Sequence, residues 1–283
     1  MTTTLIQQDN NVTTATKSNP QDYDLSKPEK KWELPAELQE ISGITWIDND
    51  HLLALEDQTP NLYLLKLDGD KASIEKKILF KENAEKKLDL EDVALVNNIA
   101  YALCSHGDIY KINDWNNKPI VDDINTFLSK DNNTEGVCFN PVTQNLLVAC
   151  KNECDISDEK KSTRAIYEFD LVAGTLKTEP YLLIHKEDFT KMSNENLEFF
   201  PSAVDVHPIT HEIYILSTRD TKCMAVFTPD RILKSFQLID KDLLLQPEGI
   251  CFAPDGTLYI STEGKHGAPP FILRFALRGA KMV

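Results

Sequence analysis

Five copies of one short pattern constrain this chain more than any other feature of its sequence. Each copy has a polar residue, a short apolar strand, a turn and a second apolar strand, which together are typical of a β-hairpin. The clearest copy runs from Gln246 to Ser261, with its turn at Pro254-Asp255-Gly256. The copies are anchored at Ser42, Glu91, Glu135, Ser202 and Glu248, at spacings of 49, 44, 67 and 46 residues. Repetition at this period favours a β-propeller, whose blades hold roughly 40–50 residues.

The strand pattern predicts an all-β fold, a five-bladed β-propeller of four-stranded antiparallel blades. The first four units each contain four candidate strands, and in the third unit the fourth of them is expected at Leu176 to Ile184. The last unit supplies only three, the third being Phe271 to Phe275. We expect the lone apolar stretch Lys31 to Leu34 to complete this unit and close the ring, because closure removes exposed sheet edges. A short helix is expected at Lys186 to Met192.

The domain organisation predicted for the 283 residues is one propeller domain over residues 31–283, preceded by a disordered polar tail over residues 1–30. The tail is rich in Thr, Asn, Gln and Asp and shows no apolar period. It has no hydrophobic core of a signal peptide, and no segment of the chain approaches the length of a membrane span.

The net charge of −15 argues against a nucleic-acid partner, because phosphate contacts come mostly from Lys and Arg. An acidic surface suits a cationic partner or a metal ion, although it also serves solubility alone. The six cysteines fall within apolar strands or at their ends, which indicates buried small side chains rather than a disulfide framework. Cys150 and Cys154 have a metal-like spacing, but no second Cys/His pair completes a zinc site.

The anchor residues of the repeat are the main candidates for a functional site. In a propeller they surround one end of the central channel, so Glu91, Glu135 and Glu248 should converge, with Ser42 and Ser202 between them. Glu40 lies two residues before Ser42 and is expected to face the same way. Three carboxylates repel one another, and protonation, a basic partner or a cation must relieve the repulsion.

No repeat supplies Lys or Arg at the anchor position, so the pattern favours a hard divalent cation, with calcium expected and no organic cofactor. Two alternatives remain open. The glutamates could bind backbone amides of the neighbouring blade and hold the ring together, or they could serve catalysis.

The residues that follow the second strand of each unit should lie on the same face, because antiparallel neighbours start and end together. They form a varied polar rim that could contact a small-molecule or protein ligand. The rim candidates are Glu56, Asp57, His106, Lys151, Asn152, Arg219, Asp220, Glu263 and His266.

The repeats open on similar short motifs, which are Glu40-Ile-Ser-Gly43, Leu90-Glu-Asp-Val93, Thr134-Glu-Gly-Val137, Pro201-Ser-Ala-Val204 and Pro247-Glu-Gly-Ile250. With these openings the chain resembles the SdiA-regulated (YjiK-like) family of bacterial β-propeller proteins over about Trp32 to Phe275. The resemblance implies a five-bladed propeller located in the cell envelope, secreted or tethered, with a calcium-linked role and a distant similarity to phytase-like propellers. The sequence itself shows no leader or anchor.

The sequence favours a non-enzymatic binding or sensory protein, because no Gly-x-Ser-x-Gly elbow, phosphate loop or His-Glu-x-x-His motif is present. The first alternative is a metal-dependent hydrolase of phosphate esters or lactones, which would use the bound ion as a Lewis acid. The second alternative is a scaffold that docks a protein partner on its charged rim.

Overall fold

A computed structural model describes residues 22–81, 88–152, 154, 156, 159 and 161–278. The regular secondary structure of the described residues is almost entirely β-strand, with one 3-10 helix, η1 (Ala36–Leu38), and one α-helix, α1 (Lys186–Ser193). Neither helix is long and apolar enough to cross a membrane.

Antiparallel meanders follow one another along the chain, each starting with an innermost strand. The first comprises β2 (Ile41–Asp48), β3 (His51–Glu56), β4 (Asn61–Asp68) and β5 (Lys71–Leu79), and the second β6 (Leu90–Val96), β7 (Ile99–Cys104), β8 (Ile109–Asn113) and β9 (Ile120–Ile124). The third comprises β10 (Thr134–Asn140), β11 (Asn145–Cys150), β12 (Arg164–Asp170), β13 (Thr175–Leu176) and β14 (Leu182–Ile184). The next comprises β15 (Pro201–Val206), β16 (Ile213–Ser217), β17 (Cys223–Phe227) and β18 (Leu233–Leu238), and the last β19 (Pro247–Phe252), β20 (Leu258–Thr262) and β21 (Phe271–Phe275).

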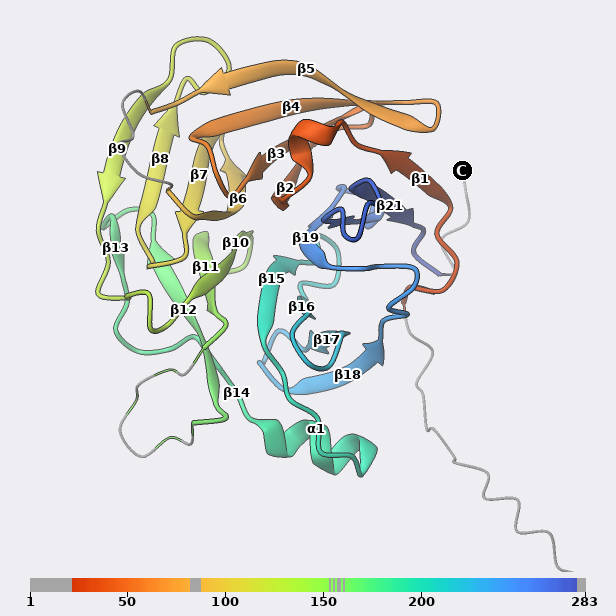
Figure 1. Ribbon diagram of the computed structural model, residues 1–283. Helices are drawn as coiled ribbons and strands as arrows, with labels where there is room; N and C mark the ends of the chain where they lie inside the picture. The colour runs from red at the N-terminus through yellow and green to blue at the C-terminus, as the bar shows by residue number, and fades with distance from the viewer. Residues whose placement is uncertain are drawn as a thin grey trace, which may run out of the picture.

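The innermost strands form a closed circle of contacts. β2 contacts β6, β6 contacts β10, β10 contacts β15, β15 contacts β19, and β19 contacts β2 again. Figure 1 shows these strands around the centre, with β5, β9, β13, β18 and β1 at the periphery. The prediction of a mostly β fold built from several antiparallel sheets is confirmed.

The N-terminal strand β1 (Lys30–Glu33) completes the last meander, as predicted. It pairs antiparallel with β21 from Lys30 opposite Arg274 to Glu33 opposite Phe271. It also meets β5 in parallel at one position, Glu33 opposite Lys71, so the last and first meanders are continuous in one eight-stranded sheet. The first and last parts of the chain are therefore held together by backbone hydrogen bonds.

The predicted disordered tail, residues 1–30, extends too far, because its last part contains buried residues. Tyr23 and Leu25 are only 1% and 2% exposed and pack in the core beside β16 and β19. The hydroxyl of Tyr23 donates a hydrogen bond to the carbonyl of Gly256 at 2.5 Å. Two isolated apolar residues in a polar segment show no period, which is why the pattern missed them. Residues 1–21 of the predicted tail lie outside the described residues.

The predicted fourth strand of the third unit, Leu176 to Ile184, is also wrong as one strand. It is divided into β13 and β14, both of which pair with β12. Pro180 lies in the interruption and has no N–H to donate to a sheet ladder. The predicted helix is present as α1 and ends one residue later than expected, at Ser193.

Candidate functional site

Each of the five anchor residues is the extra residue of a β-bulge at the beginning of an innermost strand. The pairing register with the second strand shifts at Ser42, Glu91, Glu135, Ser202 and Glu248. A bulge leaves its extra residue outside the ladder and re-aims its side chain. The sequence repeat therefore marks one recurring backbone irregularity, placed at the same end of every innermost strand.

The three predicted glutamates are brought together with a lysine, and we call Glu91, Glu135, Glu248 and Lys151 the glutamate mouth. Lys151 follows the end of β11, and its Nζ lies 3.0 Å from Oε2 of Glu135. The other oxygen of Glu135, Oε1, accepts a hydrogen bond from the Asn133 amide. No repeat has Lys or Arg at the anchor position; the basic group beside Glu135 is Lys151, a predicted rim residue that follows the second strand of its unit.

Burial dominates the electrostatics of the glutamate mouth. Burial, and then the charges of Glu135 and Asp89, raise the pKa of Glu91 from 4.5 to about 10. Burial also raises the pKa of Glu248 from 4.5 to about 8, although Lys151 acts in the opposite direction. Burial therefore favours the protonated form of both groups.

Glu135 and Lys151 behave as an ion pair within this buried setting. Burial raises the pKa of Glu135 even though Lys151 and Asn133 favour its ionised form. Burial alone would lower the pKa of Lys151, but Glu135, Glu248 and Glu91 outweigh it and the pKa is raised. The single ammonium group thus interacts with all three carboxyl groups.

The other residues of the predicted metal site are engaged elsewhere. The Ser42 hydroxyl donates to the Glu40 carbonyl at 3.4 Å, and the Ser202 hydroxyl donates to the Pro247 carbonyl at 3.3 Å. The exposed Glu40 carboxylate accepts a hydrogen bond from the Gln58 amide. Its charge, after burial, helps to raise the pKa of Glu263 to about 7. Glu40 and Glu263 therefore interact on the rim.

Among the described residues, no three His, Cys, Asp or Glu side chains are placed so that they could hold a metal ion. Lys151 lies against Glu135 in this arrangement, so a cation at the glutamate mouth would compete with the Lys151 ammonium group for that carboxylate.

The predicted rim residues divide into structural and accessible groups. Glu56 is buried and accepts hydrogen bonds from the backbone N–H groups of Gln58 and Thr59, both at 2.9 Å, so it stabilises a turn. Its contact with a ligand stays a prediction. The guanidinium carbon of Arg219, Cζ, lies 4.7 Å from the centroid of the Phe200 ring, so the guanidinium group stacks over an aromatic face.

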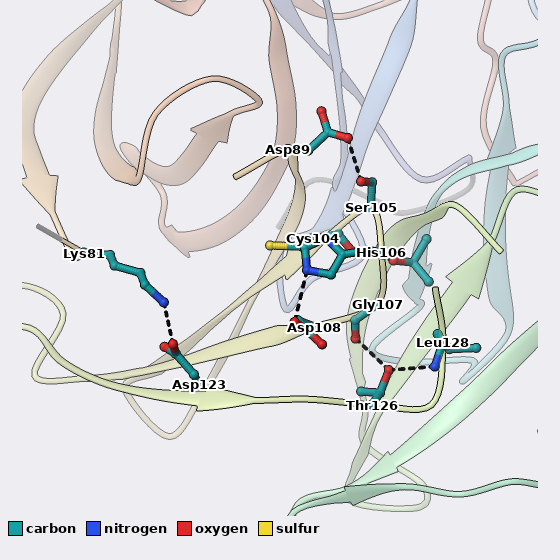
Figure 2. Close-up of polar contacts among 11 residues, drawn as sticks. Lys81, Asp89, Cys104, Ser105, His106, Gly107, Asp108, Asp123, Thr126 and Leu128 are labelled. Atoms are coloured by element: carbon teal, nitrogen blue, oxygen red, sulfur yellow. Dashed lines mark hydrogen bonds and ion pairs between the residues drawn. The ribbon is translucent and has the colours of Figure 1, made fainter. Parts of the chain in front are cut away.

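The remaining rim residues lie in turns around the mouth. The backbone N–H groups of Lys151 and Asn152 donate to Asn133 and Asn132 at 2.8 and 3.0 Å, which positions Lys151. His106 bonds Asp108 at 3.0 Å, as Figure 2 shows. The charge of Asp57 also raises the pKa of Glu263, as a smaller cause than burial and the charge of Glu40. Asp220 and His266 are exposed and have positive φ angles of 59° and 54°.

Two residues that support the mouth were missed. Asp89 and Asn133 each lie two positions before a mouth glutamate, and both have positive φ angles, 57° and 49°. Asn133 binds Glu135, and Asp89 accepts a hydrogen bond from the Ser105 hydroxyl at 2.6 Å (Figure 2). Extending the superposition of the repeats by two residues would have found them, because Asp and Asn tolerate the left-handed conformation better than most residues.

The cross-strand link that one hypothesis assigned to the glutamates is made by two buried aspartates instead. Asp92 in β6 accepts the Val137 N–H of β10 at 2.8 Å, and Asp205 in β15 accepts the Phe252 N–H of β19 at 3.0 Å. A Cβ atom at Gly43 would lie 2.3 Å from Oδ1 of Asp92. The glycine at this repeat position in β2 therefore makes room for the aspartate of the next unit.

Comparisons with known proteins support the fold. A solved structure of Myxococcus xanthus glutaminyl cyclase is similar with a TM-score of 0.55 and 13% identity, over 89% of this chain and 96% of that one. The PQQ-bound aldose sugar dehydrogenase of Streptomyces coelicolor is similar with a TM-score of 0.54 and 10% identity, over 89% and 98% of the two chains. A luciferin-regenerating enzyme is similar with a TM-score of 0.50 and 11% identity, over 86% and 80%.

At these identities the structural likeness concerns the fold alone. A search of the curated proteins returned no match. The model of the SdiA-regulated family, in contrast, matches residues 19–266, which include every innermost strand and the whole glutamate mouth. The chain therefore belongs to the SdiA-regulated family and has its β-propeller-like fold.

Proposed function

We propose that this chain is a five-bladed propeller that acts as a non-enzymatic binding protein and takes a cation at the glutamate mouth. The closed circle of contacts among β2, β6, β10, β15 and β19 supports the number of blades. The observation that carries the function is that the carboxyl groups of buried Glu135 and Glu248 and of half-buried Glu91 all interact with the ammonium group of Lys151. A second positive charge would compensate the two glutamates that Lys151 leaves protonated.

A cation competes with protons for Glu91 and Glu248. Their raised pKa values, about 10 and about 8, mean that binding of a cation to their ionised forms releases protons. We expect cation affinity to rise from pH 6 to pH 9 for this reason. Calcium is the first cation to test, and ethylammonium is the organic counterpart that represents a ligand carrying an ammonium group.

The experiment measures thermal unfolding of the chain against calcium chloride or ethylammonium chloride, with chelator as the reference state. A ligand that binds only the folded state adds about 2.7 kcal/mol at a free concentration a hundredfold above its Kd. Glu135→Gln, which keeps the shape of the side chain, should weaken the response. Lys151→Gln removes the ammonium group that competes with a bound cation for Glu135 and should therefore strengthen the response.

The matched control is Glu195→Gln, which removes one carboxylate from an exposed site beyond α1. It should leave the cation response unchanged. If neither cation shifts the melting temperature of the native chain or of Lys151→Gln, the proposal is wrong. Calcium-dependent turnover of phosphate esters or lactones that Glu135→Gln abolishes would replace it with the hydrolase hypothesis. A protein partner captured specifically through Arg219, with no cation response, would replace it with the scaffold hypothesis.

A further inference from the structure

We propose a second binding site, for a small uncharged apolar molecule, at the opposite end of the central channel from the glutamate mouth. A cavity of about 340 Å³ lies there, and every innermost strand contributes to its wall. Its lining includes Ile44 from β2, Val93 from β6, Val137 from β10, Val206 from β15 and Ile250 from β19. This volume falls at the lower end of the range for small-molecule pockets, about 300–1,000 Å³.

The cavity is separate from the glutamate mouth along the strands. The mouth glutamates occupy the bulges at the start of their strands, whereas the cavity lining begins two residues later and continues into the hairpin turns. The turns contribute Pro141, Pro208 and Pro254. Next to two of these prolines, Val142 and Ile209 are 56% and 58% exposed. The hairpin turns that follow the cavity lining therefore carry apolar side chains.

The polar groups of the cavity indicate that its ligand carries no charge. Both oxygens of Asp205 already accept backbone N–H groups, those of Val206 at 2.8 Å and Phe252 at 3.0 Å. Its carboxyl group disfavours an anion, and the surrounding apolar side chains cannot replace the hydration of a cation.

Trp46 contributes to the lining, but its indole N–H is itself buried and does not open onto the cavity. The side chains that line the cavity are mostly Ile, Val, Leu, Phe and Pro. They favour an uncharged apolar molecule.

The test uses N-phenyl-1-naphthylamine, an uncharged apolar dye whose fluorescence increases in apolar surroundings. We expect saturable binding of one dye per chain. Thr45 lines the cavity and is only half-buried, so Thr45→Phe fills the space with little overpacking and should weaken binding at least about tenfold. Thr175→Phe makes the same change at an exposed position in β13 and should leave binding unchanged.

The folding of each variant is checked by its cooperative thermal transition, and Thr45→Leu serves as a milder filling variant if Thr45→Phe does not fold. Glu135→Gln should bind the dye as the native chain does, so failure of the cation proposal and failure of this one are distinguishable. Non-saturable binding, or equal binding by the Thr45 variants and Thr175→Phe, would show that the dye binds elsewhere and would overturn the inference.

Discussion

Replacing Glu248 with glutamine should stabilise the protein at neutral pH, although it removes a central residue of the candidate site. Burial raises the pKa of Glu248 from 4.5 to about 8, so at pH 7 the native state keeps a proton that the unfolded chain has released. Each pKa unit corresponds to about 1.4 kcal/mol, so holding this proton up to pH 7 costs at most about 3 kcal/mol of unfolding free energy. The amide introduced by Glu248→Gln does not titrate, so the variant would avoid this cost.

The sign of the pH dependence follows from the same linkage. The native state binds more protons than the unfolded state between pH 4.5 and about 8, so this residue makes stability fall as pH rises through that window. Glu248→Gln should therefore add up to about 3 kcal/mol at pH 7 but only about 0.8 kcal/mol at pH 5. Its profile of stability against pH should be flatter than that of the native chain.

The assay is urea unfolding followed by circular dichroism at pH 5 and pH 7, with chelator present so that no divalent cation binds. The exposed Glu195→Gln variant reports the effect of removing one negative charge from the surface. If Glu248→Gln is neutral or destabilising at pH 7, or gains as much at pH 5, the carboxyl group is ionised and compensated in the native state. The argument from burial would then be refuted.

Three further changes test the frame around the site. Deleting residues 1–29 should destabilise the protein far more than deleting residues 1–21, because only the longer deletion removes the buried Tyr23 and Leu25; urea midpoints compare the two. Asp92→Ala should cost about 2–4 kcal/mol in the same assay by leaving backbone N–H groups in β6 and β10 without acceptors, and a smaller loss would mean that water replaces the carboxylate. Gly43→Ala should cost at least about 1–3 kcal/mol, since its Cβ would lie 2.5 Å from the Cα of Asp92; an unchanged melting temperature would contradict the close approach.

The repeat, the hairpins and the candidate glutamates could be predicted from the sequence because they depend on local order. Alternating apolar strands and turn residues recur with each unit, and their superposition places Glu91, Glu135 and Glu248 at one position without knowledge of any contact. The closing strand also followed from this local count, because the last unit lacked one strand and the N-terminal segment supplied it.

Only the tertiary structure could show how the charges of the site are compensated. An antiparallel hairpin already places Lys151 on the same face as Glu135, which lies 16 residues before it. The structure adds the contact of its ammonium group with the Glu135 carboxylate and the burial that governs the pKa values of the glutamates. The contacts of Tyr23 and the cross-strand bonds of Asp92 and Asp205 likewise join segments far apart in the chain. A repeat determines which positions are equivalent, whereas burial and pairing between units depend on distances that exist only after the ring has closed.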